Sequence, residues 1–455
     1  MESRVFIYIR GFLLKIAGNM ETPETDVASQ WPVWRKIAFR FFFIYFMIQL
    51  APWTWFDDIP GAGYLTRYYY QLTDWTVNAG NRYIFHVKDV LVPVAGSGDT
   101  SYGWAQLWTF LFLAAAGCLI WSLADRKRTS YRIADYWLRT MVRYFIAMTA
   151  LLYGVIKIFA LQMPFPNLSQ LATPLGDFLP MRLSWMFMGY STRYQVFAGI
   201  MEAVAGLLLL NRKTVTLGLC LAAGVFANVA MMNLSYDIPV KIFSLQLLAY
   251  CLFLLAYESP RIIDFFILNR PAAATDLYAL PYSGKWMRIT RIALKAVFIF
   301  IAVGMLLYNT WNRYKMVRAQ ADLPPIRSGI YDVTTFAVNG DTIPERNTDT
   351  LRWRDIVFDK GGLGSVGSTD TLFLQRYRRG YFTYQPESAN QLITFTKSRF
   401  DTTTLVRFRY EMPAPDRMQL RTVLRGDSLY VELVRSKRHF QLAERQFHWL
   451  SEANR

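Results

Sequence analysis

The amino-acid sequence predicts a bundle of membrane-spanning helices followed by a C-terminal all-β domain. The 455-residue chain is 53% hydrophobic and 16% aromatic but only 18% charged, whereas an average soluble domain carries about 25% charged residues. Seven apolar stretches are long enough to cross a bilayer, which takes about 20 residues each. From about residue 325 the pattern changes to short segments of alternating hydrophobicity, which is typical of β-strands.

The N-terminal segment, residues 1–36, is expected to lie on the cytoplasmic face of the membrane. Within Met1–Met20, the basic residues Arg4, Arg10 and Lys15 alternate with apolar side chains. The apolar core of this stretch is short, it is interrupted by a lysine, and no clear cleavage site follows, so a signal peptide is not indicated. A basic amphipathic stretch of this kind is typical of a helix that lies in the membrane interface.

The next part of the chain carries the predicted membrane spans. Residues 37–138 hold two spans with an outer loop, residues 139–258 hold four spans, and residues 259–312 hold a basic loop with the last span. The individual spans are predicted at residues 37–56, 104–124, 139–161, 194–211, 215–235, 240–257 and 293–312.

Lys and Arg residues gather in the connections on one side of these spans. The loop after the second span reads DRKRTSYR, the turn after the fourth reads NRK, and five basic residues follow the sixth. The alternate connections, 57–103, 162–193 and 236–239, carry few basic residues for their length. Because short basic loops stay in the cytoplasm, we expect a cytoplasmic N-terminus and an external β domain. In a bacterium this arrangement means the inner membrane, with the β domain in the periplasm.

Residues 325–455 are expected to form eight or nine short antiparallel strands that close into a small barrel or a sandwich. Asn339-Gly340-Asp341 and Arg425-Gly426-Asp427 are hairpin signals between such strands. The last stretch, FHWLSEANR, is expected to close the domain with Trp449 packed against it. The alternating segments are IYDVTTFAV, LRWRDIVF, DTLFLQRY, QLITFTK, TLVRFRYE, MQLRTVL, SLYVELV and HFQLAERQF.

Polar residues inside the predicted spans are candidates for a site, because charges in a bilayer are costly and often functional. At a rise of about 1.5 Å per residue, four neighbouring spans place such groups in one layer of the outer leaflet. The candidates are Lys157, Glu202, Asn228, Asn233, Asp237 and Lys241. Lys157 and Glu202 are placed to neutralise one another. Two interpretations stay open: a structural salt bridge with snorkelling lysines, or a site for a small molecule, a quinone or a proton.

Residues 139–258 also carry motifs of a known family. The run LLYGVIKIFALQ contains Gly154 and Lys157 in a G-x-x-K arrangement, and AGIMEAVAGLLLLNRKT contains Glu202 before a basic turn. The last two of these four spans are joined by MNLSYDIPVKIFSLQLL. Together these runs resemble the four helices of the DoxX family. The resemblance leads us to expect a His soon after the last run, where this chain has Gln246.

The resemblance implies a four-helix membrane module. DoxX-like proteins have been linked to quinone-coupled sulfur oxidation and to membrane oxidoreductase assemblies. The larger clan also contains the membrane region of vitamin K-dependent carboxylase-like proteins, which likewise carry an extracytoplasmic β domain. The Gln246 departure argues against a proton-accepting or metal-binding residue at that position.

Several other chemistries are disfavoured by the sequence. The three cysteines lie in apolar runs without a CxxC pair, which disfavours a disulfide framework or a zinc site. None of the three histidines lies in a span, so a haem held by two histidines is not predicted in the membrane region. Gly362-Leu-Gly364-Ser-Val-Gly367 matches a dinucleotide-binding pattern, but a strand-like segment follows it, which favours a hairpin loop.

The favoured hypothesis is an accessory or binding subunit of a membrane redox or envelope assembly. Its bundle would hold a lipid or quinone in the outer half, and its β domain would dock a periplasmic or membrane protein partner. The first alternative is a membrane enzyme of the vitamin K-dependent carboxylase-like type, in which a membrane lysine acts as base; a lysine paired with Glu202 argues against this. The second alternative is a structural anchor for the β domain. The net charge of +17 does not predict a nucleic-acid partner, because its larger share is the signal that sets orientation.

Overall fold

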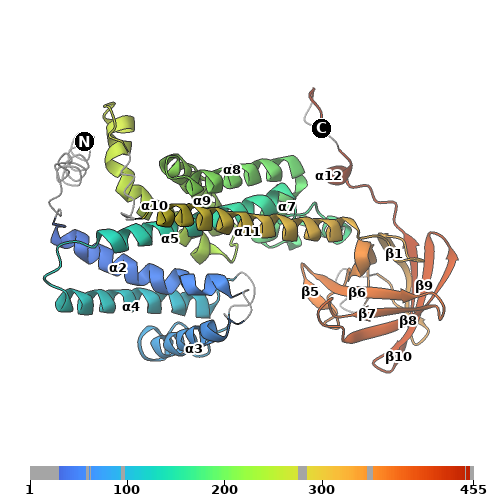
Figure 1. Ribbon diagram of the computed structural model, residues 1–455. Coiled ribbons are helices and arrows are strands. Elements are labelled where there is room, and N and C mark those ends of the chain that lie inside the picture. Colours follow the sequence, from blue (N-terminus) through green and yellow to red (C-terminus); the bar gives the residue numbers. More distant parts are fainter. Residues whose placement is uncertain are drawn as a thin grey trace, which may run out of the picture. The chain divides into compact units, whose positions relative to one another are not determined.

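The structure is a computed structural model, and it confirms the predicted fold class of a helical membrane bundle followed by an all-β domain (Figure 1). The chain divides into two compact units. The helical unit comprises Met1–Ile158 and Val196–Leu307, and the barrel unit comprises Phe159–Gln195 and Tyr308–Arg455. The predicted interfacial helix over Met1–Met20 lies outside the described residues. The structure describes residues 30–57, 61, 63–93, 98–274, 284–345, 352–445 and 447–450.

Seven of the helices in the described part of the chain are long and apolar enough to cross a membrane. They are α2, α4, α5, α8, α9, α10 and α11, and they correspond one for one to the predicted spans, so the chain is a multi-pass membrane protein. The helices are α2 (Val33–Leu50), α3 (Gly63–Gly80), α4 (Ser101–Ala124), α5 (Arg132–Ile158), α6 (Leu168–Leu171), α7 (Pro180–Tyr190), α8 (Thr192–Leu210), α9 (Val215–Ser235), α10 (Lys241–Ile262), α11 (Lys285–Arg318) and α12 (Gln441–Glu444).

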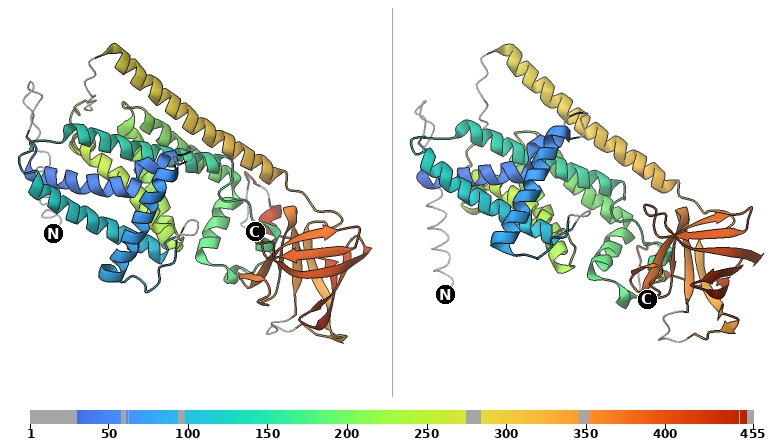
Figure 2. Two further views of the ribbon diagram at one scale, coloured as in Figure 1. Left: turned by 60° about the horizontal axis from the view of Figure 1, so that its bottom comes forward. Right: turned by 90° about the horizontal axis from the view of Figure 1, so that it is seen from below.

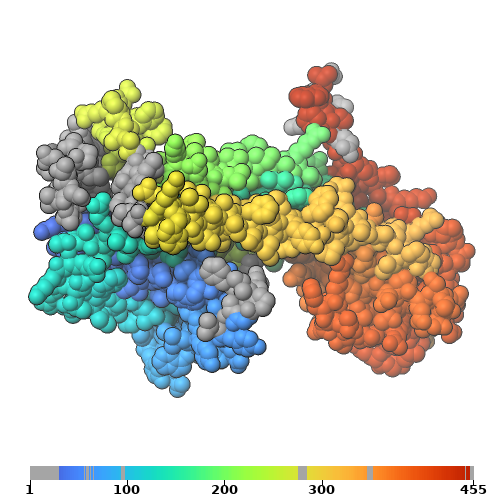
Figure 3. All heavy atoms as spheres, in the orientation of Figure 1, coloured from blue at the N-terminus to red at the C-terminus, as the bar shows by residue number. Residues whose placement is uncertain are grey.

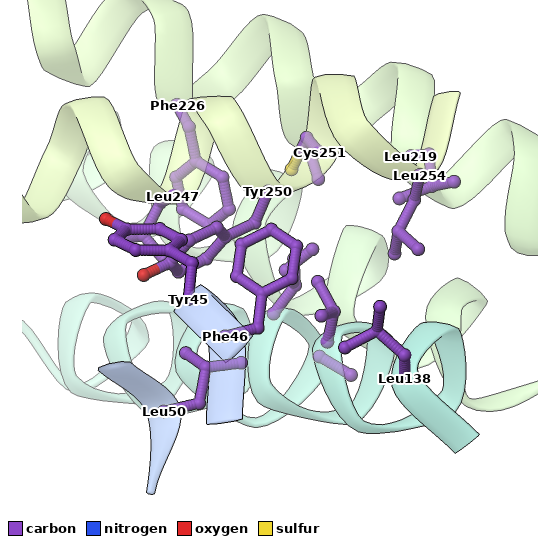
Figure 4. Close-up of a cluster of buried hydrophobic side chains, with 14 of the residues drawn as sticks. Tyr45, Phe46, Leu50, Leu138, Leu219, Phe226, Leu247, Tyr250, Cys251 and Leu254 are labelled. Atoms are coloured by element: carbon purple, nitrogen blue, oxygen red, sulfur yellow. The ribbon is translucent and has the colours of Figure 1, made fainter. Parts of the chain in front are cut away.

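The core of the helical unit takes buried side chains from α2, α4, α5, α8, α9 and α10, and Figure 4 shows part of it. The Phe46 ring of α2 packs edge-on against Tyr250 and Phe253 of α10, with ring centroids 5.3 Å and 4.8 Å apart. Leu138 from α5 and Leu219 from α9 are buried in the same cluster. The contacts of Phe46 bring together α2 and α10, which lie far apart in the sequence.

Glycines bring α5 and α8 into direct backbone contact. A Cβ added at Gly154 would lie 2.6 Å from the backbone nitrogen of Ala203, and one added at Gly199 would lie 2.7 Å from the carbonyl oxygen of Gly154. Two turns further along α8, a Cβ at Gly206 would lie 2.8 Å from the carbonyl oxygen of Ala147. Membrane helices associate through small residues of this kind, because small residues let the backbones approach closely.

The helix α11 presents apolar side chains around most of its circumference. No residue of its most apolar stretch is buried, and Figure 3 shows the helix, in yellow, on the face of the molecule. Its contacts in the helical unit include a hydrogen bond from Lys295 Nζ to the carbonyl oxygen of Leu210 (2.9 Å) and a ring contact between Phe298 and Tyr144 (6.4 Å). Such a helix suits a position surrounded mainly by lipid.

The C-terminal domain is a closed barrel, which decides between the two predicted closures. Eight antiparallel strands follow one another in the order β1-β3-β4-β6-β7-β8-β9-β10, and β10 pairs back onto β1; short β2 and β5 attach to β1 and β6 (Figure 2). The strands are β1 (Gly329–Val338), β2 (Asp341–Thr342), β3 (Asp355–Asp359), β4 (Leu363–Val366), β5 (Leu374–Arg376), β6 (Arg379–Glu387), β7 (Leu392–Thr396), β8 (Thr404–Ala414), β9 (Arg417–Leu424) and β10 (Asp427–Arg435).

Aromatic side chains fill the interior of the barrel. Phe382 and Phe395 stack with ring centroids 4.0 Å apart, and Trp353 packs edge-on against Phe408 at 5.9 Å. Both predicted hairpin turns are confirmed: Asn339-Gly340 joins β1 to β2 and Arg425-Gly426 joins β9 to β10, each with two successive positive φ angles. Turns with positive φ at both central residues match the twist of paired strands.

Three details of the predicted β domain are wrong. The Gly362–Gly367 segment is not a hairpin loop, because its residues Leu363–Val366 form strand β4 inside the barrel wall. Gly364 has no side chain, which leaves room for the Phe382 ring; an added Cβ would lie only 2.5 Å from that ring. The segment HFQLAERQF is not a strand: the Glu444 carboxylate accepts a hydrogen bond from the Phe440 amide (3.0 Å), which closes the short helix α12. Trp449 does not pack against the domain but is 91% exposed.

The connection between α5 and α8 belongs to the barrel unit. Asp359, the last residue of β3, accepts hydrogen bonds from the Leu168 amide (3.1 Å) and the Ser169 hydroxyl (2.8 Å) at the start of α6. Burial raises the pKa of the Asp359 carboxyl above its ordinary value, and the bonds from Ser169 oppose this shift. Because this connection and the barrel form one unit, both lie on the same side of the membrane. Four spans, α8 to α11, lie between the connection and the barrel in the sequence, and an even number of spans returns the chain to the side from which it started.

Candidate functional site

Lys157 and Glu202 form a buried ion pair between α5 and α8. The Lys157 ammonium donates a hydrogen bond to Glu202 Oε1, and the two side chains are only 8% and 3% exposed. The second carboxylate oxygen, Glu202 Oε2, is buried without a hydrogen-bond partner. The pair follows directly from the glycine contacts, because Gly199 lies against the Lys157 Cβ and Glu202 lies one turn further along α8. The pairing that the sequence suggested is therefore present.

Lys241 and Asp237 form a separate group at the turn between α9 and α10. Lys241 Nζ lies 2.6 Å from Asp237 Oδ1 and 3.9 Å from Asp99 Oδ2. The Asp99 carboxylate also accepts hydrogen bonds from the Lys241 amide (2.7 Å) and the Ile242 amide (3.1 Å), so it caps the N-terminus of α10. Sequence reasoning missed Asp99, because it lies 142 residues before its partner and no local pattern connects them.

The two asparagines of α9 lie in different environments. Asn233 is 4% exposed, and its amide donates a hydrogen bond to the Val240 carbonyl oxygen at 3.3 Å, which braces the turn into α10. Asn228 is exposed on the outside of the helix. The six sequence-derived candidates thus form one buried pair and one group at a turn, while Asn228 lies apart from both.

A cavity of about 400 Å³ opens in the helical unit between α2, α4, α5 and α10. Its polar wall consists of neutral side chains together with one carboxylate. Gln49 lies at the end of α2, Gln106 near the start of α4, Tyr153 near the end of α5 and Gln246 near the start of α10. Because the spans alternate in direction, all four residues lie at the same end of the bundle. The polar lining residues are Gln49, Asp99, Gln106, Tyr153 and Gln246.

The cavity wall combines hydrogen-bonding groups with an apolar surface. Gln49 Oε1 is a buried acceptor without a partner, while the Gln246 amide is 3.5 Å from the Tyr45 hydroxyl. The Asp99 carboxylate is already held by the two backbone amides of α10, and the other polar groups of the wall are neutral amides and a phenol. Leu107, Ile242 and Phe243 line the rest. Such a wall suits a molecule with a neutral oxygen-bearing head and an apolar body.

Neither Lys157 nor Glu202 lines this cavity. The pair is nevertheless close along the chain, because the lining residue Tyr153 lies one helical turn before Lys157 on α5. Gln246, the residue that replaces the expected His, is itself part of the wall. The sequence carried one usable signal for this site: three glutamines lie at the same end of three predicted spans.

Within the described residues, no three His, Cys, Asp or Glu side chains come together as a metal ion would require. His86 is exposed in the connection before α4. His439 lies near the C-terminus, where its ring contacts the Glu444 carboxylate at 3.2 Å.

Comparisons with known proteins give one partial similarity. No family model matches the chain, and no solved structure matches it. The chain is 33% identical over 84 residues to the uncharacterized protein YwoB of Bacillus subtilis (strain 168). The similar region is 18% of this chain and 54% of YwoB, so the chain spans about half the length of the curated relative that it matches.

Proposed function

We propose that this chain is a binding subunit of a membrane assembly, and that its helical unit holds a quinone or a lipid in the outer half of the bilayer. The supporting observation is the cavity of about 400 Å³ with its neutral polar wall. Ligand sites have volumes of about 300–1,000 Å³ and combine apolar walls with a few polar groups. The unpaired Gln49 Oε1 needs a donor such as a quinol or lipid hydroxyl.

The alternative of a membrane enzyme with a lysine base gains no support from the geometry. A lysine acts as a base when it is desolvated and has no carboxylate partner. Lys157 instead donates to Glu202, and it does not line the cavity. The alternative of a purely structural anchor predicts an empty cavity. Mass spectrometry of the ligands that co-purify with the chain, described below, tests this alternative as well.

In the proposed arrangement the N-terminus is cytoplasmic, and the barrel lies on the periplasmic side of a bacterial inner membrane. The barrel would dock a periplasmic or membrane protein partner, and no nucleic acid is involved. The support comes from the basic residues between spans: Arg126, Lys127 and Arg128 follow α4, and Arg212 and Lys213 follow α8. Short basic loops of this kind stay in the cytoplasm.

A cavity-filling substitution tests the proposed ligand site. Gly103 lines the cavity, and a Cβ there would meet only ordinary contacts at 3.8 Å, so Gly103→Leu can enter the cavity without displacing backbone. We expect the full chain, purified in mild detergent, to carry a specific quinone or lipid that mass spectrometry of the extracted ligands detects. Gly103→Leu should lose this ligand and keep its thermal stability.

The matched control for that experiment is Gly224→Leu on α9, where nothing lies within 4 Å of an added Cβ. This variant should retain the ligand at the wild-type level. A quinone in the wild-type extract supports a redox assembly, and a single enriched lipid supports an envelope role. The proposal fails if the wild-type protein carries only the bulk lipid mixture, or if Gly103→Leu retains the ligand as well as Gly224→Leu does.

The orientation is tested by a reporter at the C-terminus. An alkaline phosphatase fused after Arg455 in a bacterial host should be active, because the enzyme folds only in the oxidising periplasm. A green fluorescent protein at the same position should stay dark. The converse pair of results, with bright fluorescence and inactive phosphatase, would reverse the proposed orientation.

A further inference from the structure

One face of α7 is apolar and exposed. Leu179, at the start of the helix, and Leu183, Phe187 and Tyr190 are 64%, 45%, 66% and 41% exposed. At 3.6 residues per turn, these four positions fall within an arc of about 80° around the helix axis. We call these four residues the α7 stripe. A contiguous exposed apolar face of this kind marks a contact with a membrane or a partner.

The opposite face of α7 is fixed to the barrel unit. Ser184 and Met188 are buried on that side, and the Arg182 guanidinium donates a hydrogen bond to the Tyr377 hydroxyl at 3.1 Å. At the end of the helix, a Cβ on Gly189 would lie 2.4 Å from the Pro164 carbonyl oxygen. The α7 helix, drawn in green, lies beside the barrel in both views of Figure 2. These contacts set which face of the helix points outward.

The chain itself places α7 at a membrane surface. Only Ser191 separates Tyr190, the last residue of α7, from Thr192, the first residue of the span α8. The same connection begins directly after the span α5, which ends at Ile158. An amphipathic helix that is joined to a span by a single residue has its end at the level of the lipid headgroups.

We propose that α7 lies in the plane of the membrane and that its stripe is buried in the interfacial region of the leaflet on the barrel side. Aromatic rings with a polar edge prefer this region, and Tyr190 and Tyr194 supply two of them at the junction with α8. Arg193, exposed beside them, is placed to reach lipid phosphates as basic residues at helix ends do. The barrel is thereby held to the bilayer by an in-plane helix as well as by α11.

Site-specific labelling tests this proposal on the full chain in proteoliposomes. Phe187→Cys would be labelled with an environment-sensitive fluorophore in a Cys220→Ser background, because Cys118 and Cys251 are buried and Cys220 is the exposed thiol. Leu183→Cys serves as a second stripe position in case Phe187→Cys fails to fold. The matched control is Val423→Cys on β9, which is 70% exposed on the barrel.

Nitroxide-labelled lipids should quench both stripe positions at least about threefold more strongly than they quench Val423→Cys, because interfacial helices bury their apolar face about 5–10 Å into the leaflet. Aqueous iodide should show the reverse preference. The proposal is overturned if iodide reaches the stripe labels as readily as the Val423→Cys label. That result would instead assign the stripe to a protein partner that the proteoliposomes lack.

Discussion

Glu202→Leu is expected to lower the unfolding free energy of the protein by about 3–5 kcal/mol, because removing one member of a buried ion pair leaves an uncompensated charge. The Lys157 ammonium that would remain is 8% exposed and has Glu202 as its ion-pair partner. A shift of the thermal unfolding midpoint in detergent measures the effect. The double variant Lys157→Met with Glu202→Leu should recover most of the loss, because it removes both charges and keeps the volume.

An exposed ion pair in the same helical unit provides the control. Asp237 pairs with Lys241 at 2.6 Å, but its side chain is 82% exposed, and exposed pairs contribute only about 0–1 kcal/mol. Asp237→Asn removes the charge and keeps a residue that tolerates the positive φ of 48° at this position, so it should leave the unfolding midpoint almost unchanged. If Glu202→Leu is as mild as Asp237→Asn, the Lys157–Glu202 pair is solvated in the folded protein and the proposed cost of its burial is wrong.

The double variant also separates a structural role of the pair from a role in the cavity. Tyr153 is the lining residue closest to Lys157 along α5, so the pair can act on the cavity through the position of that ring. A double variant that is stable and still carries the extracted ligand assigns the pair to structure alone. A stable double variant without the ligand assigns it a positioning role for the site.

The membrane spans could be predicted from the sequence because span length and hydropathy are local properties. The helices in the connections could not be found in the same way. In α3, four tyrosines and one tryptophan lie among Thr, Arg, Gln, Asp and Asn residues, so its mean hydropathy stays below that of a span. It is held in place by tertiary contacts such as the hydrogen bond from the Tyr69 hydroxyl to the Ile48 carbonyl oxygen at 2.6 Å.

Counting residues along a helix gives the depth of a side chain but not the direction in which it points. Asn228 and Asn233 were assigned to one layer from depth alone. They are five positions apart, and at 3.6 residues per turn this is about 140° around α9, so they cannot face the same neighbour. The structure shows this division, with Asn233 buried and Asn228 exposed. A rotation test on the sequence would have separated them.

The three glutamines indicate one end of the bundle, but the cavity itself could not be derived from the sequence, for a related reason. Its wall takes Gln49, Gln106, Tyr153 and Gln246 from four helices, and only the packing of the bundle decides which faces of these helices meet. Strand β4 was missed for the same reason. Its four residues, Leu363–Val366, include a glycine and a serine, which do not favour a strand by themselves. Their strand conformation depends on the neighbouring strands and on the Phe382 ring rather than on their own propensity.

Gly154→Leu is expected to prevent α5 and α8 from packing, and it should reduce the yield of folded protein sharply. The added side chain would meet backbone atoms of Ala203 and Gly199 at 2.6 Å and 2.8 Å, and backbone atoms cannot rotate away as a flexible side chain can. Overpacking a core typically lowers the free energy of unfolding by about 1–3 kcal/mol. We expect a clash with backbone atoms to cost at least as much as the upper end of this range. Size-exclusion profiles of the detergent-solubilised variants measure the folded fraction.

The control again is Gly224→Leu, which places the same side chain on a membrane helix where nothing lies within 4 Å. This variant should behave like the wild-type protein, because its added side chain meets no other part of the chain. Both variants lose a helical glycine and gain the same apolar surface. The difference between them therefore reports the close contact of α5 with α8 and not helix propensity or hydrophobicity. Equal yields and equal unfolding midpoints for the two variants would mean that α5 and α8 do not pack through Gly154. The Lys157–Glu202 pair, which depends on that contact, would then need a different explanation.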